Sequence, residues 1–184
     1  REAKAKDKKR LVVAPVTVPY VRQSIRNAHY FAARGLAGLL RASGLQKSEV
    51  DGLCLASFGL APDSAVGVTQ HLGLTLRWLD FLPLGGMTGI VALRRALRAV
   101  QHGDAEVVAC VGADSNGPDS FRHSLGGFSV FSRDAVFPYG AGGPNASFAF
   151  LTQYYMRQYG ATRADFGKLC VAQRDNALHF PHAL

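Results

Sequence analysis

The sequence WLDFLPLGGMTGIVALRRALRAVQH, residues 78–102, decides the fold of this chain. Its first seven residues are mostly apolar and extended in character, and a glycine-rich turn at 85–89 interrupts them. After the turn, apolar residues recur at helical spacing, which predicts a helix over 90–102 with one buried face. The residues expected on that face are Ile90, Leu93, Leu97 and Val100. The stretch therefore predicts a strand, a glycine turn and a helix that ends at Gly103.

A second apolar run follows this helix. Residues 106–112, EVVACVG, are rich in β-branched side chains, as expected of a strand buried on both faces. Strand, helix and strand at this spacing form one βαβ unit with a right-handed crossover. Because α/β proteins often place ligand sites at the turn before such a helix, the turn at 85–89 is the first candidate site, and it contains no cysteine.

Similar patterns predict further elements on both sides of this unit. Valine-rich residues 11–22 favour a first strand, although Pro15 and Pro19 restrict part of it to an edge or a loop. Asn27 suits the capping position of a helix over 28–42. The other expected elements are a strand at 52–57, a helix at 67–72, a helix at 145–159, and a helix that runs from a capping box at Thr162 to about His179. This order predicts an α/β fold.

Charge and composition narrow the possible partners. Residues 1–10 hold six basic and two acidic residues, so this segment contributes +4 of the net charge of +8 and reads as a disordered basic tail. We identify no basic face interleaved with aromatic residues, so no nucleic-acid partner is expected. A modest positive balance in the rest of the chain suits an anionic ligand such as a phosphorylated coenzyme.

The cysteines and the apolar runs indicate the compartment. No run of about 18 apolar residues predicts a membrane span, and no signal-peptide pattern is evident. Cys54 and Cys110 lie inside apolar runs, and Cys170 lies far from both in the sequence. Reduced, buried thiols explain this usage better than a disulfide or a metal site. We therefore expect a cytoplasmic protein without a bound metal.

The turn and its helix resemble the thiolase superfamily, and most of all its lipid-transfer-protein-associated, thiolase-like branch. In condensing thiolases a cysteine opens the helix and small residues follow it. The residues that match this pattern are Thr88, Gly89, Ala92 and Leu93. Gly86 stands where the cysteine would be, and glycine cannot form the thioester for which a helix N-terminus activates a thiol. The resemblance therefore favours the fold and argues against Cys-dependent thiolysis.

A second match lies near the end of the chain. Residues 154–183 resemble the family's tyrosine-rich segment and the helix after it, with Phe180 in place of the usual asparagine before Pro181. The resemblance covers most of 11–184 but only the first half of a thiolase. It implies an N-terminal βαβαβ half with an inserted loop or lid over about 114–160. Because the Gly-His-Pro motif and second cysteine of the other half do not occur, we expect this chain alone to be inactive.

The resemblance leaves two functions open. Cys-less members of this branch include retro-aldolases that cleave steroid side-chain CoA esters together with a small OB-fold partner. A retro-aldol step needs a base and an enolate stabiliser but no acyl-enzyme, so Gly86 is compatible with it. The alternative is a non-catalytic carrier or scaffold for a lipid or an acyl-CoA. The family also dimerises through the strand before the central helix, which implies a homodimer through 78–84.

The substrate-binding candidates lie in the turn and in the expected lid. Thr88 and the backbone N–H groups after Gly86, beginning at Met87, suit an oxyanion-binding helix terminus. In the lid, Tyr139 beside Gly140 either lines an acyl pocket or packs under its own loop. Coenzyme A would enter as part of the substrate, with no separate cofactor.

Other polar groups fit simpler roles. The glycine-rich segment 140–145 suits a turn better than a phosphate cradle, although it leads into a helix N-terminus. Four histidines have neither metal nor triad spacing and suit exposed positions: His71, His123, His179 and His182.

Overall fold

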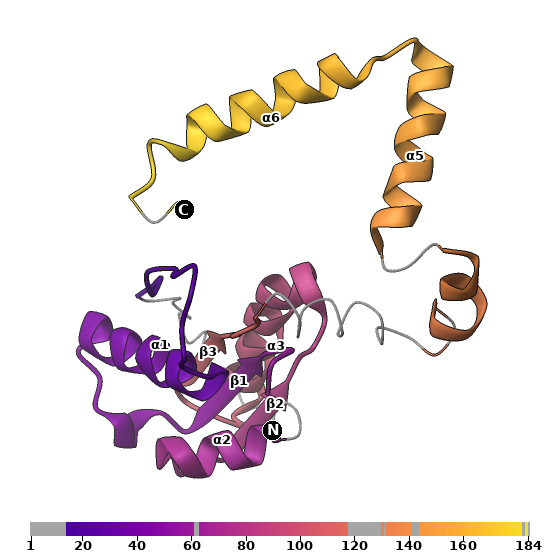
Figure 1. Ribbon diagram of the computed structural model, residues 1–184. Coiled ribbons are helices and arrows are strands. Elements are labelled where there is room, and N and C mark those ends of the chain that lie inside the picture. Colours follow the sequence, from indigo (N-terminus) through magenta and orange to yellow (C-terminus); the bar gives the residue numbers. More distant parts are fainter. Residues whose placement is uncertain are drawn as a thin grey trace, which may run out of the picture. The chain divides into compact units, whose positions relative to one another are not determined.

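The computed structural model describes residues 14–60, 63–117, 130, 132–140, 144–181 and 183. The chain divides into two compact units, one of residues 24–115 with those up to 19, the other of residues 116–184 with 20–23. We describe the two units separately (Figure 1). The predicted basic tail, 1–10, lies outside the described residues.

A parallel three-stranded sheet forms the centre of the first unit, in the order β2-β1-β3. Its strands are β1 (Gly52–Ala56), β2 (Trp78–Phe81) and β3 (Val108–Gly112). Cys54 of β1 pairs in register with Asp80 of β2 on one side and with Cys110 of β3 on the other. The strands predicted at 52–57 and 106–112 are confirmed. The strand predicted at 78–84 ends at Phe81, and Pro83 follows two residues later.

Helices cover both faces of this sheet (Figure 1). Residues of α1 (Ala28–Ser43) and α2 (Ala65–Leu72) pack with Leu53 and Leu55 of β1. Cys54 alternates with these leucines along the strand and packs instead with Ala92 of α3 (Thr88–His102). Because successive strand residues point to opposite faces, α1 and α2 lie on one face and α3 lies on the other.

The predicted caps of α1 are confirmed. The side-chain oxygen of Asn27 accepts a hydrogen bond from the Tyr30 backbone N–H at 3.1 Å. Gly44 ends the helix in the left-handed conformation, with φ of 73°. Within the helix, Gly35 lies 3.5 Å from Val111 Cγ1, measured from the position that a Cβ would occupy, so the helix approaches β3 closely.

The strand predicted over 11–22 is wrong for the residues that the structure describes. Residues 14–22 form no strand, and Ala14 has a φ of 57°, which interrupts an extended run. Val16 instead packs on α1, where its Cγ1 lies 2.7 Å from the position of a Cβ on Gly38. Pro15 and Pro19 remove two backbone donors from this segment, which explains why β-branched residues alone do not make it a strand.

The predicted buried face of α3 is also wrong. Its buried side chains are Thr88, Ala92, Ala96 and Ala99. Ile90 is 79% exposed, and Leu93 and Leu97 are exposed as well. Alanines repeat at the same helical period as the leucines but one position away, and their small side chains let the helix lie close to the sheet. The helix begins at Thr88, after a 3-10 turn at Gly85–Met87, and ends at Gly103 as predicted.

The second unit contains two consecutive helices, α5 (Pro144–Tyr159) and α6 (Arg163–Ala177). A π-helical turn, Ser132–Val136, and a 3-10 turn, Phe137–Tyr139, precede them. Both helices were predicted, as was the capping box of α6, in which the Thr162 N–H donates to Asp165 Oδ2 at 2.9 Å. In the part of the chain that the structure describes, none of the helices has the length and apolar character needed to cross a membrane.

Candidate functional site

The carboxyl ends of the three parallel strands meet at one edge of the sheet. β1 leads into Ser57 and Phe58, β2 leads into the turn before α3, and β3 leads into Asp114. Ligands of open parallel sheets bind outside this edge, so the turn at the start of α3 remains the candidate site.

Asp114 ties the ends of two strands together. Its Oδ1 accepts hydrogen bonds from Ser57 Oγ at 2.9 Å and from the backbone N–H groups of Phe58 and Gly59 at 2.7 and 2.6 Å. From the sequence, Asp114 suits a polar surface loop near His123 better than acid–base chemistry, although an acid two residues after a buried strand is a signal of such an anchor. The segment that enters the site from β1 is therefore held by β3.

The turn before α3 is fixed by Thr88. Its hydroxyl accepts a hydrogen bond from the Leu84 backbone N–H at 3.2 Å and donates one to the Leu82 carbonyl at 3.4 Å. The residue is only 8% exposed. Gly85 has a φ of 64°, and Phe58 Cζ lies 3.7 Å from the position of a Cβ on it. The Thr88 side chain thus shapes the turn, and its backbone N–H donates to the Gly85 carbonyl, so both donors of this residue are used within the turn.

The surroundings of Gly86, which the family resemblance aligns with a cysteine, are open. A Cβ on this glycine would meet no other atom within 4 Å, and Met87 beside it is 63% exposed. Within the described ranges, no side chain caps α3 and no acid lies in its first turn. The start of this helix therefore carries the partial positive charge of a helix N-terminus without a side-chain cap.

The structure brings together only some of the predicted site residues. Gly86, Met87 and Thr88 are contiguous in the first unit. Tyr139, which is 86% exposed, and Gly140, with φ of 77°, belong to the second unit. Their role in substrate binding stays a prediction.

The remaining polar candidates fall in the second unit or outside the described residues. His179 is exposed just after α6, while His123, His182 and residues 141–143 of the glycine-rich turn lie outside the described residues.

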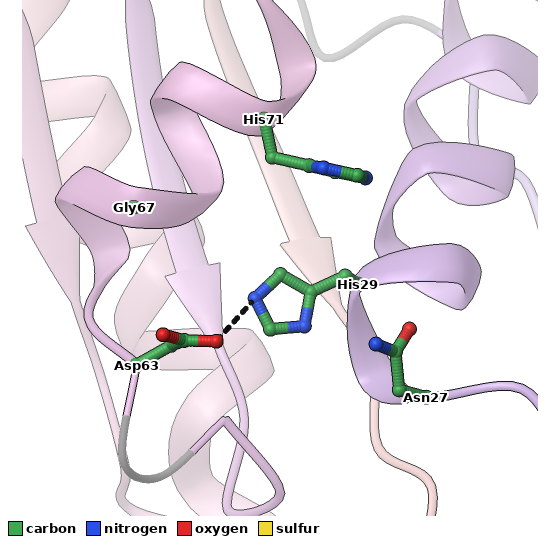
Figure 2. Close-up of a pocket in the computed structure, with 5 residues that line it drawn as sticks. All are labelled: Asn27, His29, Asp63, Gly67 and His71. Carbon is green, nitrogen blue, oxygen red and sulfur yellow. Dashed lines mark ion pairs between the residues drawn. The ribbon is translucent and has the colours of Figure 1, made fainter.

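A second, polar pocket lies between α1 and α2 and has a volume of about 300 Å³. Figure 2 shows the His29 imidazole beside the Asp63 carboxylate, with the His71 ring above it. His29 Nε2 lies 3.2 Å from Asp63 Oδ2, and the two imidazole rings meet edge to face, 5.7 Å apart. His71 is exposed, as predicted. Sequence spacing gives no sign that His29 lies beside it, because they come from different helices.

The side chains of this pocket are metal-ligating types but are not arranged as a metal centre. Over the residues that the structure describes, no group of three or more His, Cys, Asp or Glu side chains is arranged to hold a metal ion. The three-residue cluster of His29, Asp63 and His71 remains a surface feature of the first unit.

Comparisons with known proteins support the fold. The chain is 29% identical over 173 residues to a steroid side-chain-cleaving aldolase of Thermomonospora curvata, which covers 89% of this chain and 44% of the relative. It is 28% identical over 177 residues to the 17-hydroxy-3-oxo-4-pregnene-20-carboxyl-CoA lyase of Mycobacterium tuberculosis, with the same coverage. No protein-family model matches the chain.

A solved structure is similar over most of the chain. The Ltp2-ChsH2(DUF35) aldolase matches with a TM-score of 0.65 and 28% identity, over 86% of this chain and 41% of that chain. The chain thus spans less than half the length of the curated relatives that it matches. The α/β, thiolase-like fold predicted from the sequence is confirmed by this similarity.

Proposed function

We propose that this chain is part of an enzyme that cleaves a carbon–carbon bond of an acyl-CoA thioester by a retro-aldol reaction. The observation that carries the proposal is Gly86, which places an open space instead of a thiol at the start of α3 in a chain similar to two C–C-cleaving enzymes. The lipid-transfer-associated branch of the thiolases, with a steroid or branched acyl-CoA as substrate, is the form of the proposal that these relatives favour.

The chemistry requires little from this chain beyond positioning. In a 3-hydroxyacyl thioester, a base removes the hydroxyl proton, the Cα–Cβ bond breaks, and the electron pair moves onto the thioester carbonyl as an enolate. The N–H groups at Gly86 and Met87 are the donors that we assign to the enolate oxygen. The enolate is then protonated at Cα, and the carbonyl product leaves. No acyl-enzyme forms, so the absent cysteine is not needed.

The apolar side chains near the turn suit a bulky acyl chain. Phe58 and Met87 both expose apolar side chains beside the turn, and Gly86 adds no atoms of its own to the space. A bulkier residue at the nucleophile position would occupy the volume that a ring-bearing substrate needs. We propose that Tyr139 and Gly140 belong to the lid over the acyl chain of the substrate.

Two assemblies complete the proposal. We propose a homodimer through residues 78–84, because β2 lies at an edge of the sheet and Phe81 and Leu84 are exposed there. We also propose a small OB-fold partner, and the similar aldolase structure supports this part of the proposal because it joins Ltp2 with a second component, ChsH2(DUF35).

A substitution at Gly86 tests the proposal. Gly86→Leu fills the open space and should weaken binding of 17-hydroxy-3-oxo-4-pregnene-20-carboxyl-CoA at least about tenfold, or about 1.4 kcal/mol, in isothermal titration. Gly167→Leu is the matched control, since this helical glycine of α6 also has no atom within 4 Å of a Cβ position. Equal affinity of both variants, or no binding by the unsubstituted chain, would contradict the proposal.

The alternative function is a non-catalytic acyl-CoA carrier or scaffold. Gly86 is compatible with it too, because a glycine supplies no reactive group, and it is the similarity to two C–C-cleaving enzymes that favours the enzyme. The two functions separate when turnover is measured with the chain assembled with its complementary half and partner. Release of a ketone or aldehyde and a shortened acyl-CoA supports the enzyme, whereas binding without product supports the carrier.

A further inference from the structure

Two cysteines that are 56 positions apart in the sequence are in-register neighbours in the sheet. Cys54 of β1 pairs with Cys110 of β3, and the two strands are parallel. In-register residues of neighbouring strands point to the same face, and such strands lie about 4.8 Å apart. This spacing falls within the range of Cα separations, about 4.4–6.8 Å, that a disulfide spans. The fold therefore places the two thiols side by side on the face that α3 covers.

The surroundings of the pair differ on its two sides. Cys54 is 1% exposed and packs with Leu82 and Ala92, whereas Cys110 is half-buried. Cys110 is the more exposed of the two residues, so we take it as the one that a small oxidant meets first. Cys54 is then the internal thiol, within reach of Cys110.

The pKa values of the two thiols also differ. The hydrogen bond between the two thiols lowers the pKa of Cys110 below its ordinary value. The same hydrogen bond and burial raise the pKa of Cys54, and Asp80, its other in-register neighbour, raises it further. Cys110 thus takes the role of the attacking thiolate, and Cys54 remains a protonated donor beside it.

We propose that Cys54 and Cys110 form a thiol–disulfide site at which a peroxide links β1 to β3. The Cys110 thiolate attacks one peroxide oxygen, the O–O bond breaks, and the sulfur becomes a sulfenic acid while hydroxide leaves and takes up the proton that the thiol released, forming water. The Cys54 sulfur then attacks the Cys110 sulfur, the S–S bond forms, and the S–O bond breaks. The hydroxyl leaves with the Cys54 proton as a second water. In sum, two thiols lose two electrons and hydrogen peroxide takes them up.

The proposed disulfide would join β1 to β3 close to the ends of both strands. Cys54 precedes Ser57 by three residues and Cys110 precedes Asp114 by four, so the link lies beneath the strand ends that Asp114 holds together. Reduction by a dithiol reverses the step, because a disulfide is exchanged by thiolates.

The test uses the chain with Cys170→Ser, which removes the exposed third thiol. The folded protein is treated with hydrogen peroxide, unfolded, alkylated and analysed by mass spectrometry. We expect both remaining cysteines to resist alkylation after the peroxide treatment. A peptide containing residue 54 should then be joined to one containing residue 110. Dithiothreitol should break this link and make both cysteines alkylatable again. In Cys54→Ala on the same background, we expect a sulfenic acid at Cys110 that dimedone traps.

Two results would overturn the proposal. One is that both thiols remain fully alkylatable at a peroxide dose that oxidises Cys170 of the unsubstituted chain. The other is that Cys110 proceeds to the sulfinic acid while Cys54 stays reduced. Because the first readout uses the natural cysteine pair, it does not depend on the folding of the Cys54→Ala variant, which circular dichroism checks separately.

Discussion

Asp114 is the residue on which the local order of the site depends most visibly. Three donors from the end of β1 converge on its Oδ1, two of them backbone N–H groups. A sequence analysis can notice an acid after a buried strand, but it cannot identify the donors, because they come from residues 57–59, more than fifty positions earlier. Gly86 is the opposite case, since its position in the family pattern was evident from the sequence alone.

Removing the Asp114 carboxylate should loosen this edge of the sheet. We expect Asp114→Ala to lower the free energy of unfolding by about 2 kcal/mol, since the hydrogen bonds of a charged group contribute about 1.5–3 kcal/mol. Urea denaturation measures the change. Asp104→Ala is the control, because the Asp104 side chain makes no hydrogen bond or ion pair within the described residues. A loss no larger than that of the control would contradict the anchoring role.

α3 shows what periodicity predicts and where it fails at the scale of an element. The βαβ order, the glycine turn and the end at Gly103 all followed from the sequence. The buried face did not, because leucines and alanines share one period and only the closeness of the sheet selects the alanines. The pairing of Cys54 with Cys110 and the approach of His29 to His71 escaped prediction for a related reason, since both depend on tertiary register.

A matched pair of substitutions tests the orientation of α3. Ala96→Leu puts a large side chain against the sheet, where Ala96 is 8% exposed, and should lower the free energy of unfolding by about 1–3 kcal/mol. Leu97→Ala removes an exposed side chain and should cost less than about 1 kcal/mol. Thermal and urea unfolding of both variants measure the difference. A larger loss for Leu97→Ala than for Ala96→Leu would mean that the leucine face is the buried one.

The whole molecule carries apolar surface on the side of α3 that faces away from the sheet. Ile90, Leu93 and Leu97 form this exposed face, and Phe81 and Leu84 extend the apolar character to the end of β2. Exposed apolar surface of this kind marks interaction sites. The sequence predicted the fold class and most of the elements. No sequence pattern, however, distinguishes apolar residues that form a core from those that are buried only at an interface with another subunit.

The proposed homodimer concerns the oligomeric state of the whole molecule. Sedimentation of the chain at micromolar concentration should give the mass of a dimer, because the exposed apolar residues near β2 gain by burial. Leu84→Lys should shift the protein toward the monomer, and Leu178→Lys, an exposed apolar position just after α6, is the control. A monomer at every concentration tested would contradict the interface at 78–84.

The central claim is that an acyl-CoA thioester binds at the start of α3 without a nucleophile. The most direct test is a titration of the ¹⁵N-labelled chain with 17-hydroxy-3-oxo-4-pregnene-20-carboxyl-CoA, followed by backbone amide chemical shifts. We predict saturable chemical-shift changes at the amides of Gly86 and Met87, because we propose that these N–H groups donate hydrogen bonds to the thioester oxygen. Shifts confined to the pocket of His29 and His71, or no shift at either amide under saturation, would contradict it.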